Sequence, residues 1–166
     1  MHILAICGSL QAKSSNRALI DAAARVLPPD VRLTVYEGLR ALPMFDPDLE
    51  RERTLPIVDE LRRAVATADA LLVACPEYGH SLPGSLKNAI DWLIGSGELE
   101  QKLVAITAAV PHPDRGRKGL AALAQTLGAV SARVAFDGPL VKGPGLEGEV
   151  AVVVRALVAA HAPASA

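Results

Sequence analysis

The sequence predicts an α/β protein in three layers, with one five-stranded parallel sheet covered by helices on both faces. Apolar runs alternate with amphipathic segments along the 166 residues, which is the order expected of repeated strand and helix units. The first run, residues 3–7, holds only apolar side chains and ends at Gly8, as is typical of a strand buried on both sides. The length suits a single domain, which we expect over residues 1–161, followed by a frayed tail at 162–166.

Each expected element rests on its own hydrophobic period. The runs expected to form strands are residues 3–7, 31–35, 70–75, 103–107 and 129–136. Apolar residues recur at helical spacing in residues 17–27, 54–68, 84–94, 120–127 and 147–161. Asn16 is expected to cap the first helix, and the connection 38–53 has no period, so we expect it to be irregular.

The strand order follows from the handedness of the connections. Right-handed crossovers leave two common orders for such a chain, and five strands favour the flavodoxin-like order 2-1-3-4-5. In that order a ligand crevice lies beyond the carboxyl ends of the first, third and fourth strands. The loops expected to border this crevice are residues 8–16, 76–83 and 108–116.

Composition excludes several classes of protein and partner. With 51% hydrophobic residues, 21% charged residues and a formal net charge of −1, the chain is neither disordered nor strongly basic, so we expect no nucleic-acid partner. No apolar stretch has the length of a membrane span, and no basic region precedes the first strand. We therefore expect a cytoplasmic protein with no membrane partner.

The two cysteines do not form a metal or disulfide motif. Cys7 and Cys75 lack the spacing of zinc ligands, and two cysteines are too few for a disulfide framework, so we expect no metal site. Both end strands that are neighbours in the expected order. They are therefore either a redox pair or, as we favour, two thiols of the core.

The first loop has the composition of a phosphate site. Residues 8–16, with the sequence GSLQAKSSN, join a buried strand to a helix N-terminus, where free backbone N–H groups and the helix dipole favour an anion. Ser9, Ser14, Ser15 and Asn16 supply neutral donors. The loop has neither the GxxxxGK[ST] motif of a nucleoside triphosphate site nor the three glycines of GxGxxG, so a monophosphate is the better interpretation.

The second loop is stiffened by two prolines and opened by two glycines, so it can present backbone amides to a flat heteroaromatic ring beside Tyr78. Residues 76–92, with the sequence PEYGHSLPGSLKNAIDW, resemble the PEYNxSxPGxLKNAIDW signature of the NAD(P)H-dependent FMN reductase family. Residues 8–16 are similar to that family's GSLRxxSxN pattern, and LP at 42–43 with DPDLE at 46–50 is similar to its LPxxNPDLE connection. The resemblance covers residues 3–106.

The resemblance implies an FMN-dependent NAD(P)H oxidoreductase of flavodoxin-like fold that reduces quinone-like or other small oxidised acceptors. The flavin would take a hydride from NADPH or NADH and pass it to the acceptor in a ping-pong sequence, with no protein residue acting as acid, base or nucleophile. The residues expected to bind the FMN phosphate are Ser9, Leu10, Gln11, Ser14, Ser15 and Asn16. Those expected at the ring are Pro76, Glu77, Tyr78, Gly79, His80 and Ser81.

The resemblance also implies a homodimer, with a dimer of dimers as the alternative, because members of the family complete the flavin pocket with the partner chain. The connection 42–50 and the single tryptophan, Trp92, point the same way if a second subunit covers them. Near the third loop, Arg115, Arg117 and Lys118 are either a site for the NADPH 2′-phosphate or, as we favour, a solvated face.

The chain departs from the family pattern at three places. Gln11 stands where the family has Arg, Gly79 stands where it has Asn, and the third loop carries two prolines and His112 in place of a Gly-rich stretch. These departures leave open a family member that has lost flavin binding. A flavodoxin-like electron carrier is a second alternative function.

Overall fold

A five-stranded parallel sheet is the centre of the computed structural model, which describes residues 1–52 and 55–162. Its strands are β1 (His2–Cys7), β2 (Arg32–Tyr36), β3 (Ala70–Ala74), β4 (Leu103–Val110) and β5 (Arg133–Val141). They lie in the order β2-β1-β3-β4-β5, and every neighbouring pair is parallel. This confirms the predicted strand order.

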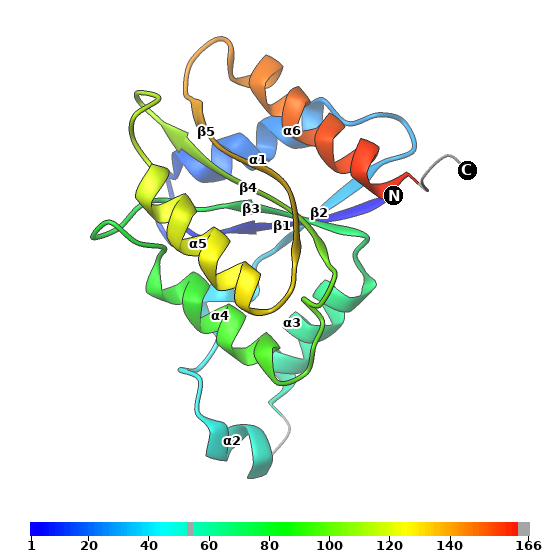
Figure 1. Ribbon diagram of the computed structural model, residues 1–166, viewed down its shortest axis with the longest axis vertical. Helices are drawn as coiled ribbons and strands as arrows, with labels where there is room; N and C mark the ends of the chain where they lie inside the picture. The colour runs from blue at the N-terminus through cyan, green and yellow to red at the C-terminus, as the bar shows by residue number, and fades with distance from the viewer. Residues whose placement is uncertain (53–54, 163–166) are drawn as a thin grey trace.

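Helices cover both faces of the sheet, as Figure 1 shows. On one side lie α1 (Ser15–Arg25) and α6 (Leu146–His161); on the other lie α3 (Pro56–Thr67), α4 (Gly84–Ile94) and α5 (Arg117–Ala129). A short 3-10 turn, η1 (Gly38–Arg40), follows β2, and α2 (Pro47–Glu52) projects from the body beyond α3 and α4. None of the helices in the described part of the chain is long and apolar enough to cross a bilayer.

The core consists of two layers, because successive strand residues point to opposite faces. In β3, Leu71 and Val73 pack against the α3, α4 and α5 side, whereas Leu72 and Ala74 pack against the α1 and α6 side. All five residues of β3 are buried. The prediction of a buried strand over residues 70–75 is therefore confirmed, and β3 ends one residue earlier, at Ala74.

Several predicted boundaries were wrong because the end of an element is set by hydrogen bonds that periodicity does not reveal. The predicted cap Asn16 lies inside α1; the cap is Ser14, whose Oγ accepts a hydrogen bond from the backbone N–H of Asn16 at 3.2 Å. Helix α5 begins at Arg117, not at residue 120. Thr54, the predicted start of the second helix, and residues 163–166 of the predicted tail lie outside the described residues.

The last two strands also differ from their predicted bounds, since both end later than predicted. β5 begins at Arg133 rather than at residue 129, and it continues beyond the predicted end at residue 136, through Gly138 and Pro139, to Val141. An edge strand tolerates a proline, and β5 is at the edge of the sheet. Its pairing with β4 makes residues 108–110, predicted to be loop, the end of a strand.

The connection 38–53 is not irregular throughout. Asp46 begins α2 in the usual way, since its Oδ1 accepts from the N–H of Asp48 at 2.8 Å and Pro47 takes the first helical position. This signal was present in the sequence DPD and was missed.

The same chain, and not a second subunit, covers Trp92 and ties down the connection. Trp92 is 1% exposed, packs edge-on against Phe45 with ring centroids 5.0 Å apart, and donates from Nε1 to the carbonyl of Pro43 at 2.9 Å. Asn88 accepts from the N–H of Phe45 at 2.7 Å and donates to the carbonyl of Pro43 at 2.8 Å. The argument that Trp92 needs a partner chain was therefore wrong.

Replacing Asn88 by Ala should lower the free energy of unfolding by about 1 to 3 kcal/mol, because it leaves the N–H of Phe45 and the carbonyl of Pro43 without their partner. Urea unfolding measures the change. Lys87→Ala, on the exposed side of the same helix, is the control and should stay within about 0.5 kcal/mol. Equal effects of the two variants would contradict the bracing role of Asn88.

Candidate functional site

The first two predicted loops meet beyond the carboxyl ends of β1 and β3. The backbone N–H of Gly8 donates to the carbonyl of Ala74 at 2.8 Å, and the N–H of Cys75 donates to the carbonyl of Thr107 at 2.7 Å. Farther out, the hydroxyls of Ser9 and Tyr78 lie 3.4 Å apart. The predicted crevice is therefore bordered by loops that contact each other directly.

The first loop leaves the N-terminus of α1 open. Ser9 turns its hydroxyl toward the backbone N–H of Gln11, at 3.4 Å, and Ser14 caps the helix. Within residues 1–52 and 55–162, no hydrogen bond engages the backbone N–H of Lys13, Ser14 or Ser15. Free donors at a helix N-terminus favour an anion.

Asn16 links α1 to β4. Its side chain is buried, and its Oδ1 accepts from the backbone N–H of Ala109 at 3.0 Å. Through this contact Asn16 holds α1 against β4. Binding of a phosphate by the same side chain stays a prediction.

The second loop contains a tight two-residue turn. Tyr78 and Ser81 exchange backbone hydrogen bonds, both at 3.0 Å, and Gly79 and His80 between them have φ of +57° and +63°. Two successive residues with positive φ are the signature of a type I′ turn. The tip of the turn is open, because a Cβ on Gly79 would meet nothing within 4 Å and Tyr78 is 52% exposed.

Glu77 holds this loop against α5. Its Oε2 accepts from the backbone N–H groups of Lys118 and Gly119, at 3.0 and 3.2 Å, and its Oε1 lies 3.2 Å from Nδ1 of His80. These contacts, with that from Gly119 the largest, lower the pKa of Glu77. The carboxylate thus occupies the N-terminus of α5, and the contact with a flavin ring that was predicted for Glu77 stays a prediction.

Gly119 is a site residue that sequence reasoning missed. A Cβ there would lie 3.0 Å from Cα of Glu77 and 3.2 Å from the carbonyl oxygen of Ser81, so only glycine lets the helix approach the loop this closely. The available signal was a glycine inside a helical pattern, which often marks close packing.

The third loop is shorter than predicted and contacts mainly itself. Nδ1 of His112 lies 3.2 Å from Oδ2 of Asp114, and Nε of Arg117 donates to the carbonyl of Pro113 at 3.1 Å. His112 and Arg115 are both exposed. The predicted cationic cluster consists of Arg115, Arg117 and Lys118. Lys118 donates its backbone N–H to Glu77, and no contact among the described residues brings the three charged groups together.

The two cysteines do not form a pair. Cys7 packs on the α1 and α6 side of the sheet, whereas Cys75 is buried on the opposite side. Burial, assisted by the charge of Glu77, raises the pKa of Cys75 to about 12. The favoured interpretation of two separate core thiols fits this placement.

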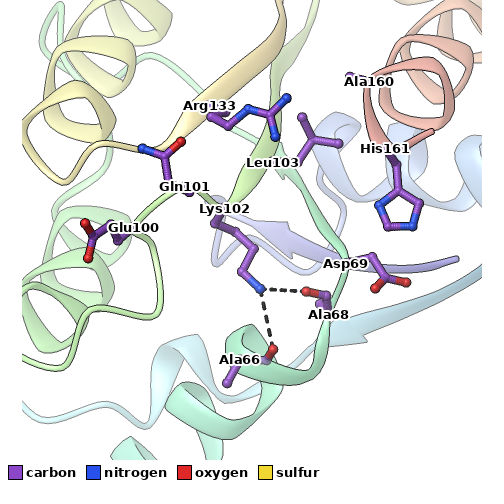
Figure 2. A pocket seen from close by; sticks show the side chains of 10 residues that line it. All are labelled: Ala66, Ala68, Asp69, Glu100, Gln101, Lys102, Leu103, Arg133, Ala160 and His161. Atoms are coloured by element: carbon purple, nitrogen blue, oxygen red, sulfur yellow. Dashed lines mark hydrogen bonds between the residues drawn. The ribbon is translucent and has the colours of Figure 1, made fainter. Parts of the chain in front are cut away.

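A different hollow, of about 370 Å³, lies at the amino ends of β4 and β5 (Figure 2). Its Lys102 donates to the carbonyls of Ala68 and Ala66, at 2.7 and 3.5 Å, and so stabilises the end of α3. Asp69 accepts from the backbone N–H of His2 at 2.6 Å. The polar groups of this hollow are engaged in hydrogen bonds that hold the fold together. We therefore place the candidate site at the carboxyl ends of the strands. Nowhere in the described ranges do three His, Cys, Asp or Glu side chains gather as metal ligands.

The free energy of unfolding should fall as the pH rises from about 9 to about 12. Burial raises the pKa of Tyr36 from 10.0 to about 12 and that of Cys75 from 9.0 to about 12. Both groups are neutral when protonated, so the stability they contribute is complete below their unfolded pKa values and is lost as the pH approaches the folded ones. Urea unfolding at several alkaline pH values measures the slope. Tyr36→Phe combined with Cys75→Ala should flatten it, and an unchanged slope would contradict this account.

Comparison with known proteins extends these observations. The sequence model of a family described as NADPH-dependent FMN reductase matches residues 1–143. An NAD(P)H-dependent FMN reductase of Pseudomonas aeruginosa is 36% identical over 121 residues, which cover 73% of this chain and 64% of the relative. An NAD(P)H:quinone oxidoreductase of Solanum tuberosum is 39% identical over 95 residues, which cover 55% of this chain and 49% of the relative. The matched region therefore spans about half to two thirds of the length of these relatives.

Solved structures show the same fold. The flavoenzyme NAD(P)H:(acceptor) oxidoreductase FerB of Paracoccus denitrificans superimposes with a TM-score of 0.76 at 22% identity, covering 95% of this chain and 97% of that one. Oxidised flavodoxin 1 of Bacillus cereus superimposes with a TM-score of 0.67 at 15% identity, covering 96% and 98%. The fold is flavodoxin-like, as predicted, and the chain belongs to the NADPH-dependent FMN reductase family.

Proposed function

We propose that the chain is an FMN-dependent NAD(P)H oxidoreductase that reduces quinone-like or other small oxidised acceptors. One observation carries the proposal: an open helix N-terminus on the first loop lies beside an open turn on the second loop, joined by the contact of Ser9 with Tyr78. The names of the relatives, which are FMN and quinone reductases, support the same function.

The first loop fits the phosphate of FMN. The unbonded amides of residues 13–15 and the partial positive charge at the start of α1 suit a dianion. Ser9 and Ser14 add hydroxyls, while Leu10, Gln11 and Ser15 supply the rest of the loop. No carboxylate of the chain occupies this helix end in the described structure, in contrast to α5.

The second loop fits the flavin ring. Backbone groups of Pro76, Glu77 and the turn at 78–81 can face a planar polar edge, and there is open space above Gly79. Tyr78 is exposed beside this space. The tether from Glu77 to α5 holds the loop in place before the ligand arrives, which lowers the entropy lost on binding.

The chain's part in the reaction is orientation. Bound FMN would supply the redox chemistry, by exchanging a hydride with the nicotinamide and then with the acceptor. The two loops would hold the ring from one side, so that the donor and the acceptor would use the remaining open face in turn. No side chain of the site needs to move a proton in the first half-reaction.

The test is an absorbance spectrum of the purified protein with and without added FMN, followed by NAD(P)H oxidation with a quinone. We expect a bound-flavin spectrum and turnover with either nicotinamide cofactor. Flavin binding without NAD(P)H turnover would instead assign the chain to electron carriers, and failure to bind flavin would make it a family member without the cofactor.

We also propose that the protein is a cytoplasmic homodimer. Two thiols that cannot pair suit a reducing compartment. The connection leading to α2 projects from the body and carries Met44, which is 77% exposed (Figure 1). A second copy covering this arm would remove that apolar surface from water.

Ser9→Ala should weaken FMN binding by about tenfold and leave riboflavin binding unchanged, because a hydrogen bond to a charged phosphate contributes about 1.5 to 3 kcal/mol. Quenching of flavin fluorescence measures both affinities. Asn16→Ala is the comparison, since its loss of the contact with Ala109 should appear first as lower stability. Equal affinity of the wild type for FMN and riboflavin would contradict the phosphate assignment.

Gly79→Asn should tighten FMN binding by about threefold to tenfold, since the amide adds one hydrogen bond to the polar ring edge. The backbone permits it: Asn adopts positive φ more readily than other residues with a side chain, and the new Cβ meets nothing within 4 Å. Gly79→Ala is the matched control, with the same Cβ but no amide, and should not tighten binding. Unchanged affinity in a folded Asn variant would contradict the expectation.

The active form should sediment at twice the chain mass, and double-reciprocal plots at several acceptor concentrations should be parallel. Met44→Glu should shift the protein toward the single-chain mass, because it places a charge on the exposed arm. Val152→Glu, at a half-exposed position on α6, is the control and should leave the dimer intact. A fully active monomer or intersecting lines would overturn this part of the proposal.

A further inference from the structure

A cation from outside the predicted site reaches the first loop. Nη2 of Arg40, at the end of η1, donates to the carbonyl of Leu10 at 2.5 Å. Arg40 and the loop line a common hollow of about 210 Å³ together with Ser9, Gln11 and Arg17. This contact could not be predicted from the sequence, because the two partners are 30 residues apart.

The charges around this hollow leave Arg40 uncompensated. Arg17 is neutralised by Glu37, at 2.7 Å, and by Asp21, at 3.3 Å. Arg40 forms no ion pair with any carboxylate that the structure describes, and its hydrogen bond to Leu10 uses only one of five N–H donors. A free guanidinium therefore faces the loop that holds the open end of α1.

The position of Arg40 is fixed by the residues before it. Leu39 and Tyr36 are buried in the core, so η1 is anchored immediately before Arg40. Lys13 also carries a free charge on the loop, but no hydrogen bond in the described residues holds its ammonium group. Arg40 is thus a cation held at the loop before any ligand is present.

We propose that Arg40 binds the 5′-phosphate of FMN. The inference rests on the proposed function and adds a residue to its phosphate site. Amides and hydroxyls of the first loop are neutral donors, and a dianionic phosphate is bound more strongly when a guanidinium adds charge-assisted hydrogen bonds. The 2′-phosphate of NADPH has the same chemistry, so the test compares the two sources directly.

The decisive variant is Arg40→Gln, which removes the charge and leaves a shorter polar side chain with two N–H donors. Its affinities for FMN and riboflavin are measured by fluorescence quenching at low and high salt, together with the thermal stability of the flavin-free protein. We expect FMN affinity to fall about tenfold or more, riboflavin affinity and thermal stability to be unchanged, and the salt dependence of FMN binding to become weaker.

Two further variants separate the charge from other effects. Gln11 lines the same hollow, so Gln11→Arg in the Arg40→Gln background should restore FMN affinity by returning a cation to it. Arg25→Gln is the control: it removes an arginine paired with Glu147 at the other end of α1 and should change neither affinity.

Three results would overturn the inference: no loss of FMN affinity, an equal loss for FMN and riboflavin, or a loss confined to the KM of NADPH relative to NADH. A wild-type protein that prefers FMN to riboflavin, with the preference retained in Arg40→Gln, would overturn this inference alone. A wild-type protein that binds neither flavin would overturn the proposed function, and the role of Arg40 with it.

Discussion

The ladder that joins β1, β3 and β4 continues one residue beyond the strands, and the site depends on that continuation. The hydrogen bonds from Gly8 to Ala74 and from Cys75 to Thr107, at 2.8 and 2.7 Å, set the points at which the first two loops leave the sheet. Because the strands are parallel, both loops leave from the same edge. Ser9 and Tyr78, which are 69 residues apart, are thereby brought within 3.4 Å.

Among the helix N-termini at this edge, those of α1 and α5 border the first two loops, and the chain treats these two differently. Each offers unbonded N–H groups and a partial positive charge, which attract an anion. At α5 the anion is internal, the carboxylate of Glu77, and the result is a second loop held in place. At α1 the cap is the neutral Ser14, and the backbone N–H groups of residues 13–15 form no hydrogen bond within the described part of the chain. The terminus of α5 is thus occupied by a side chain of the protein itself, whereas no carboxylate in the described part of the chain occupies that of α1.

The elements around the site are joined by buried side-chain amides. Asn16 ties α1 to β4, and Asn88 ties α4 to the connection before α2, each through a buried amide that bonds to backbone groups. A buried side-chain amide without partners would be costly, so such contacts specify one arrangement of the elements. Arg40 extends this pattern to the surface, where its guanidinium fixes the carbonyl of Leu10 and keeps its charge.

The sequence by itself determined the class of fold, the strand order and the three loops at the carboxyl edge. These follow from hydrophobic period, chain direction and the handedness of crossovers, which are local or topological properties that a linear pattern records. Residues 84–94 were predicted as a helix and form α4 with the same bounds. The positions of the first two loops were likewise readable from their polar, proline- and glycine-rich composition.

Only the tertiary structure decided what individual side chains do. Glu77 meets the N–H of Gly119 across 42 residues, and Asn16 meets Ala109 across 93, so no local pattern could assign either contact. The two cysteines were neighbours by strand order but lie on opposite faces, because Cys75 follows the residue that pairs with Cys7 and the side chains of a strand alternate. A hydrophobic period identifies a helix or a strand. The role of a side chain depends instead on which distant backbone groups the packed helices and strands bring within hydrogen-bond distance of it.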